Sequence, residues 1–117
     1  MEYKFGVEFD WNFLAAAAND RSFNIPGRSL AHTHLNTLGV EQDVNQAGIR
    51  DESLKLDLMM ELSRPAELWR FPIETISQSD NGFERGFQST VLFPHWSFRL
   101  KPGASWDLVI THTLKYL

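Results

Sequence analysis

Two segments of the sequence alternate strictly between apolar and polar residues, and this alternation limits the chain to a fold built from β-strands. From Tyr3 to Leu14 the odd positions are aromatic or aliphatic, and from Ser53 to Ser63 the even positions are Leu or Met. A period of two places alternate side chains on opposite faces of a strand, whereas in a helix the same residues would scatter around the axis. Each segment is therefore predicted to be a strand with one buried face.

The rest of the chain is predicted to add shorter strands, separated by turns. Apolar residues keep the same period at residues 68–77, 87–93, 96–100 and 106–114. Residues 28–38 are predicted as another strand, and residues 39–48, which are polar and show no period, as a loop or weak edge strand. Asp80-Asn81-Gly82 has the composition of a tight hairpin turn. Pro65 is expected to end a strand, and Pro72 to lie at a sheet edge or a bulge.

Six or seven strands with almost no helix predict an all-β fold, an antiparallel β-sandwich in which residues 1–117 form one domain. A chain of 117 residues is close to the commonest domain size, and neither half is long enough to keep a core of its own. The predicted strands run close to both ends of the sequence. A domain trimmed from a larger protein would show this arrangement, and so would a compact small protein.

The composition excludes several classes of function. The formal net charge of −4 argues against a nucleic-acid partner, because such proteins depend on basic contacts to phosphates. No run of about 20 apolar residues is present, so no membrane-spanning helix is expected. The absence of cysteine excludes disulfides and thiolate metal sites and fits a cytoplasmic protein. No cofactor is expected, because the sequence lacks a glycine-rich phosphate loop.

The aromatic content, 13% with four Trp, is unusual, and exposed aromatic rings often stack on sugars. Strand parity places each Trp on the apolar face of its own predicted strand. We therefore expect all four rings to fill the space between two sheets. These are Trp11, Trp69, Trp96 and Trp106. This interpretation disfavours a free-standing carbohydrate-binding module, which needs aromatic rings outside the core.

The titratable residues form no pattern that predicts catalysis. His32 and His34 would point the same way on a strand and could share a metal ion, but no third ligand follows at a recognisable spacing, so no metal site is predicted. His112 lies among apolar positions and is expected to be a hydrogen-bonded core histidine. A glycosidase needs two facing carboxylates about 5–10 Å apart. The carboxylates within residues 74–84 are interpreted as charges on solvent faces and turns, and no catalytic residue is predicted.

The segment from Trp69 to Ser89 carries more polar residues than a simple hairpin requires. Hydrogen-bonding side chains gather on both sides of the predicted turn. A buried polar network and a sugar-facing loop would both use such residues. For a sugar-facing loop, the candidate carbohydrate contacts are Gln78, Asp80, Glu84, Arg85 and Gln88.

The same segment, WRFPIETISQSDNGFERGFQS, resembles the pattern W-x-x-P-x-x-T-x-S-Q-S-E-x-G-x-x-x-x-x-Q-G in the C-terminal β-sandwich of glycoside hydrolase family 57 amylases and 4-α-glucanotransferases. The opening run FGVEFDWNFLAAAANDRSF is similar to the first strand and following loop of that domain. The matching residues are Phe5, Gly6, Val7, Glu8, Phe9, Asp20, Arg21, Trp69, Pro72, Thr75, Ser77, Gln78, Ser79, Gly82 and Gln88. Two positions depart from the pattern, with Asp80 in place of Glu and Ser89 in place of the final Gly.

The resemblance implies a supersandwich like that of galactose mutarotase, within a parent enzyme that cleaves or transfers α-1,4-glucan chains with retention. In that family the catalytic carboxylates lie on an N-terminal (β/α)-barrel, which this chain does not contain, so no catalytic residue is carried over. The implied role is a non-catalytic domain that packs on the barrel and borders the glucan cleft. Its implied partners are the catalytic barrel and an α-glucan.

Two other functions remain open from the sequence. The first is an independent carbohydrate-binding domain, which requires exposed aromatic rings. The second is a small mutarotase-like enzyme that uses His32 or His34 with a carboxylate, and it requires a histidine within about 3 Å of a substrate oxygen. Docking against the missing barrel agrees with the leading hypothesis and predicts an exposed apolar patch larger than is typical of a monomer.

Overall fold

The described residues of the chain form strands and turns, and none of them is helical, which confirms the all-β prediction. The computed structural model describes residues 2–11, 21–30, 33, 35, 37–79 and 82–117, with only the backbone described for 75–79 and 83–88. The strands are β1 (Glu2–Gly6), β2 (Phe9–Trp11), β3 (Arg21–Asn24), β4 (Gly39–Asp51), β5 (Leu56–Ser79), β6 (Gly82–Arg99) and β7 (Ile110–Tyr116).

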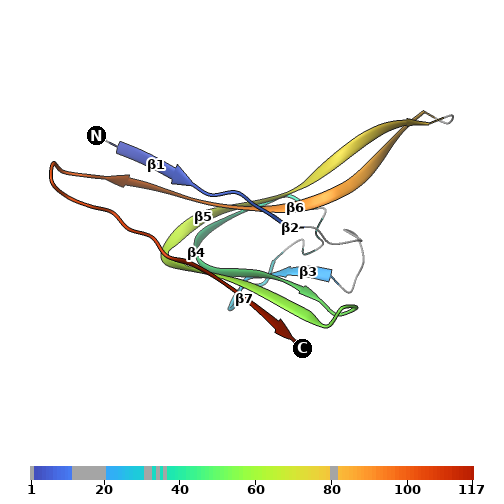
Figure 1. Cartoon of the computed structure of the whole chain (residues 1–117), viewed down its shortest axis with the longest axis horizontal. Helices are drawn as coiled ribbons and strands as arrows, with labels where there is room; N and C mark the ends of the chain where they lie inside the picture. Colours follow the sequence, from blue (N-terminus) through green and yellow to red (C-terminus); the bar gives the residue numbers. More distant parts are fainter. Residues whose placement is uncertain (1, 12–20, 31–32, 34, 36, 80–81) are drawn as a thin grey trace.

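The strands make one antiparallel sheet that folds over on itself. Its order is β1-β6-β5-β4-β3, with β2 also paired to β6 and β7 to β5. The first part of β5, residues 56–62, pairs with β7, whereas residues 67–79 pair with β6. Figure 1 shows the result as two layers, with β1 and β6 in one and β3 and β7 in the other. The long strands β4 and β5 pass from one layer to the other.

The bend in β5 lies at residues 63–65. The pairing of β4 with β5 jumps there from Gln46↔Glu61 to Val44↔Ala66, so β5 has extra residues that turn the sheet. The prediction that Pro65 ends a strand is wrong, because β5 continues through it. A bulge tolerates proline, since the backbone there donates no ladder hydrogen bond.

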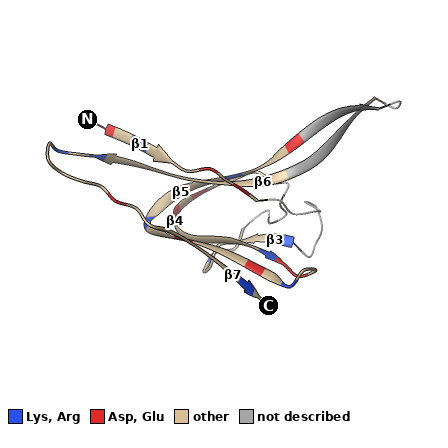
Figure 2. Ribbon diagram, viewed as in Figure 1, with Lys and Arg blue, Asp and Glu red and all other residues tan. Residues whose placement is uncertain are grey.

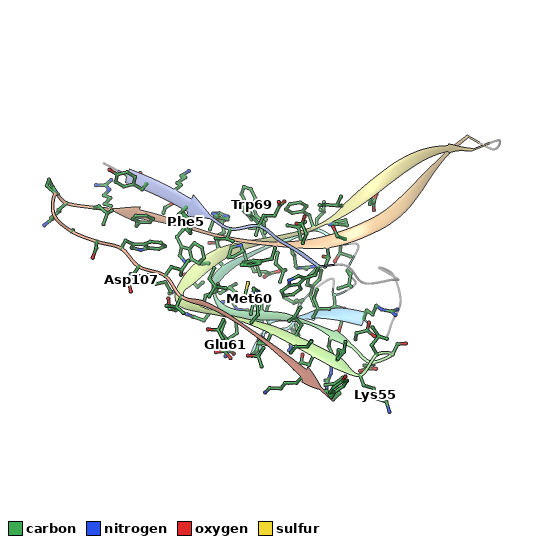
Figure 3. All side chains as sticks on the ribbon, in the orientation of Figure 1. Phe5, Lys55, Met60, Glu61, Trp69 and Asp107 are labelled. Carbon is green, nitrogen blue, oxygen red and sulfur yellow. The ribbon has the colours of Figure 1, made fainter. Side chains whose placement is uncertain are left out.

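The core lies between the two layers. Met60 is inaccessible to solvent and Leu62 nearly so, as predicted for the inward face of this segment. Leu54 is 51% exposed and lies in the turn before β5, so its predicted place on that face is wrong. Figure 3 shows Met60 between the layers. The buried residues of the core cluster are Phe23, Ile25, Leu35, Val44, Ala47, Ile49, Met60, Leu62, Ala66, Leu68, Leu92 and Trp96.

Several strand boundaries differ from those predicted. The expected loop or edge strand at residues 39–48 belongs to β4, an internal strand between β3 and β5. Bulges between Glu41 and Gln46 hide its period. The described residues of 28–38 form no strand, and the strand before them is β3, which begins at Arg21. The predicted strand from Tyr3 is interrupted between β1 and β2, and its residues 12–14 lie outside the described residues.

The hairpin between β5 and β6 is as predicted. Ser79 pairs with Gly82, and Gly82 has a φ of 110°, a conformation that glycine adopts at little cost. Pro72 lies beyond Arg70, the last residue of β5 paired with β4, and next to a register shift between Ile73 and Glu74. Both observations confirm the expectation of an edge or a bulge at this proline.

A buried ion pair joins β3 to β4. Arg21 and Asp51 are cross-strand partners, and the Arg21 Nε donates to Asp51 Oδ2 at 2.8 Å. The other carboxylate oxygen, Oδ1, accepts the backbone N–H of Leu54 at 3.0 Å. Asp51 therefore anchors both β3 and the turn that leads into β5.

We predict that Asp51→Ala lowers the free energy of unfolding by about 3 kcal/mol, because it leaves the buried Arg21 guanidinium without this carboxylate. The measurement is urea denaturation of the 117-residue chain. Asp107→Ala is the matched control. Its exposed carboxylate pairs with Arg64 at 3.2 Å, and its loss should cost about 1 kcal/mol or less. Equal losses in the two variants would contradict the prediction.

Candidate functional site

The predicted sugar contacts lie on the hairpin formed by β5 and β6. Asp80 lies outside the described residues, and the side chains of the other four candidates, Gln78, Glu84, Arg85 and Gln88, are also outside the description. Their backbones belong to two paired strands, which run together away from the body of the sheet (Figure 1). Their contact with sugar stays a prediction.

The tryptophans differ from one another in exposure. Trp96 is 6% exposed and belongs to the core, as predicted, and Trp11 and Trp106 are partly buried against it. Trp69 is 44% exposed, so its predicted place in the core is wrong. Figure 3 shows Trp69 on the outer side of the layer that contains β1 and β6.

The neighbours of Trp69 on β5 explain why its side chain points outward. Leu68 and Arg70 are buried and occupy the inner face of β5 instead. The Arg70 guanidinium lies 4.9 Å from the centroid of the Phe23 ring and donates to Thr37 Oγ1 at 2.8 Å. Burial lowers the pKa of Arg70, whereas the nearby carboxylate of Glu41 raises it. A buried arginine with these contacts takes the place that parity assigned to tryptophan.

An aromatic groove lies where the inner faces of β1 and β6 meet the segment that leads to β7. The Phe98 and Trp106 rings stack with their centroids 4.2 Å apart. The centroid of the Phe5 ring lies 6.0 Å from that of Trp106 and 6.2 Å from that of Trp96. Phe5 is 46% exposed. The groove encloses about 550 Å³ and is lined by Phe5, Val7, Phe98, Trp106, Leu108 and Ile110. All six of these lining residues are apolar.

A second aromatic cluster lies on the outer face of the same layer. The centroid of Trp69 is 4.6 Å from that of His95 and 5.9 Å from that of Phe93. Beside these rings, Glu67 Oε1 accepts a hydrogen bond from Gln42 Nε2 at 2.9 Å. The hollow here measures about 310 Å³. Nothing in the local sequence pattern marks this site, because parity places Trp69 inside.

Of the described histidines, His95 lies 3.5 Å from a carboxylate oxygen of Glu67, and His112 lies on β7. His32 and His34 lie outside the described part of the chain, so the mutarotase-like hypothesis stays a prediction. His112 is exposed, so its predicted place in the core is wrong. Its ring makes T-shaped contacts with Phe9 and Trp11, with centroid distances of 4.6 Å and 5.7 Å. Partial burial against these rings lowers its pKa below the usual 6.5. Within the described ranges, no three His, Asp or Glu side chains could hold a metal ion.

Charged side chains are spread along the strands rather than gathered into one basic surface in the part of the chain that Figure 2 colours. No helix in the described ranges has the length and apolar character needed to cross a membrane.

Comparison with known proteins gives a consistent result. Residues 1–110 match the family model described as "Alpha-amylase/4-alpha-glucanotransferase, C-terminal". The chain is 32% identical over 111 residues to alpha-amylase 1 of Dictyoglomus thermophilum, an alignment that covers 95% of this chain. It is 47% identical over 38 residues, 30% of this chain, to a 4-alpha-glucanotransferase of Thermococcus kodakarensis. No solved structure matches the chain significantly.

These relatives are much longer than the chain. The alignments span 16% of the length of the Dictyoglomus protein and 6% of the length of the Thermococcus protein. What the relatives share with this chain is therefore one region of each.

We predict that Trp69→Ala changes the free energy of unfolding by at most about 1.5 kcal/mol, because the ring is half exposed and packs against only part of one face. Trp96→Ala, the matched control, should cost about 3–5 kcal/mol, because it empties a buried site. Urea denaturation monitored by far-ultraviolet circular dichroism measures both. A loss for Trp69→Ala as large as that for Trp96→Ala would support the parity-based placement of Trp69 in the core.

Proposed function

The chain belongs to the family of C-terminal domains of alpha-amylases and 4-alpha-glucanotransferases, and we propose that it is a non-catalytic domain that packs on the catalytic domain of an α-glucan-active enzyme. The family match over residues 1–110 supports the placement within such an enzyme. The names of the two relatives, an alpha-amylase and a 4-alpha-glucanotransferase, support α-glucan as the substrate of the whole protein.

The groove at Phe5 is the observation that carries the docking proposal. Its rings are held in place by mutual packing, since Phe98 and Trp106 stack within 2° of parallel. The Arg64 guanidinium lies 5.2 Å from the centroid of the Trp106 ring, within the range of a cation–π interaction. A rigid apolar surface loses little entropy when a partner covers it, and buried aromatic rings contribute strongly to association.

The position of the groove supports the catalytic domain as its occupant. The family is defined as C-terminal, so the catalytic domain of such an enzyme precedes this region. Any preceding chain joins through β1, and β1 carries Phe5 in the groove. Figure 1 shows β1 along one side of the molecule, with its start free of the other strands except β6. A preceding domain would thus enter beside the surface that we propose it covers.

The hairpin formed by the end of β5 and the start of β6 supports the proposal that this domain borders the glucan cleft. It projects beyond the body of the domain (Figure 1) and brings the segment with Gln78, Glu84, Arg85 and Gln88 away from the core. We assign these four residues, together with Asp80, as the side chains that reach the glucan when the domain is docked.

The test of this function uses the 117-residue chain and the remainder of its full-length gene product as separate polypeptides. We expect the chain alone to release no product from maltoheptaose and to bind the remainder. Phe5→Asp should weaken that association at least ten-fold, because it places a charge in the apolar groove. Association is measured by isothermal titration calorimetry, and hydrolysis or transfer by product chromatography.

Tyr116→Asp is the control, since it adds the same charge at an exposed aromatic residue of β7 outside the groove. Its association should match that of the unaltered chain. Glucan cleavage or transfer by the chain alone would overturn the non-catalytic role. Association that survives Phe5→Asp unchanged would overturn the assigned docking surface.

A further inference from the structure

We propose that the outer face around Trp69 is a binding site for an α-linked gluco-oligosaccharide, distinct from the hairpin contacts and on the opposite face of the layer from the docking groove. The choice of an α-linked sugar rests on the proposed function. The site itself rests on the geometry of five described residues, Trp69, Phe93, His95, Glu67 and Gln42, contributed by three neighbouring strands.

The indole of Trp69 forms a fixed platform. Trp69 and Phe93 are cross-strand partners, so their side chains share one face of the sheet. His95 packs edge-on against the indole, with an interplanar angle of 69°. Contacts with two neighbouring rings restrict the rotamer of Trp69 although the ring is 44% exposed.

Gly6 of β1 makes room for this cluster. A Cβ atom at Gly6 would lie 2.6 Å from Phe93 Cζ, closer than such atoms approach one another, and 3.2 Å from His95 Cβ, which is an unusually tight contact. The missing side chain therefore lets the Phe93 ring lie against β1 and support the platform from the side. Glycine inside a strand usually weakens the strand. Here it lies at the position where a side chain would collide with the aromatic cluster.

Polar groups stand at the edge of the platform. Glu67 lies two residues before Trp69 on the same strand, so both side chains point to the same face. Its Oε1 accepts from Gln42 and its Oε2 lies 3.5 Å from His95 Nε2. In the described part of the chain no hydrogen bond reaches His95 Nε2. Each carboxylate oxygen can accept more than one hydrogen bond, so Glu67 can still bind a ligand hydroxyl.

This combination fits a pyranose ring. One face of a glucose ring carries only C–H groups and packs on an aromatic ring, while its hydroxyls lie around the rim and need acceptors and donors. Trp69 offers the apolar surface, and Glu67 with Gln42 offers the polar rim, in the proportion typical of small-ligand sites.

The space on both sides of Trp69 fits an oligosaccharide rather than a single sugar. One hollow, of about 310 Å³, includes Glu67 and His95, and another, of about 380 Å³, includes Val40 and Phe71. Trp69 lines both of them, so the indole lies between two hollows. A chain of linked sugars can cross the indole and place consecutive rings on either side.

The test is a fluorescence and calorimetric titration of the 117-residue chain with maltoheptaose. We expect binding that changes the tryptophan emission, and at least a ten-fold loss of affinity in Trp69→Ala. Glu67→Gln should weaken binding several-fold while leaving the fold intact, because the amide replaces one oxygen acceptor by a donor. Circular dichroism and urea denaturation of each variant show that it is folded.

Tyr116→Ala removes an exposed aromatic ring away from the site and should bind as the unaltered chain does. Cellohexaose, with the same sugar in β-linkage, should bind at least ten-fold more weakly. No binding of maltoheptaose, or equal binding by Trp69→Ala, would overturn the site. Equal binding of cellohexaose would overturn the assignment of an α-linked ligand.

The two proposals fail independently. If Trp69→Ala abolishes association with the remainder of the gene product and maltoheptaose does not bind, the outer face is a contact between domains and this inference is wrong. If maltoheptaose binds through Trp69 but the chain never associates with that remainder, the docking proposal is wrong and the sugar site stands.

Discussion

The bend of β5 at residues 63–65 is the constraint on which the rest of the structure depends. The residues at the bend also hold the segment that returns to β7. Ser63 exchanges two hydrogen bonds with Val109, through its backbone N–H at 3.0 Å and its Oγ at 2.8 Å. Arg64 accepts the Trp96 Nε1–H at its carbonyl, 3.2 Å away. The corner that folds the sheet therefore also holds Val109, which lies between the groove residues Leu108 and Ile110.

Local alternation predicts those parts of the fold in which each strand keeps a strict period. Met60 and Leu62 face the core as expected, and the hairpin at Gly82 forms, because both depend on residues close in sequence. The strand β4 is different. Between Glu41 and Val44 the strand has one residue more than its partner β5, which shifts the inward parity, and Asp43 in this bulge takes a φ of 53°. A polar, aperiodic segment thus becomes an internal strand whose register depends on partners elsewhere in the chain.

The candidate sites show the same limit. Strand parity assigns charged residues to the solvent face and tryptophans to the buried face. At residues 69 and 70 of β5 this assignment is the reverse of the observed one. Arg70 is stable inside because Phe23, Thr37 and Glu41 surround it, and these residues come from other parts of the chain. The motif at residues 69–89 leads to the correct family, since it depends only on residue order. The exposure of its first residue depends on tertiary contacts that residue order does not display.

Neighbouring residues of the same strands serve opposite faces of the layer. On β6, Trp96 packs against the groove while His95 belongs to the outer cluster. On β1, Phe5 enters the groove, and the absence of a side chain at Gly6 leaves space for the outer rings. A domain docked through the groove would therefore keep the outer face open to a polymer. Binding one stretch of a glucan chain there would raise the local concentration of the rest of that chain near the catalytic domain. Such an arrangement increases the occupancy of an active site without requiring any catalytic group in this domain.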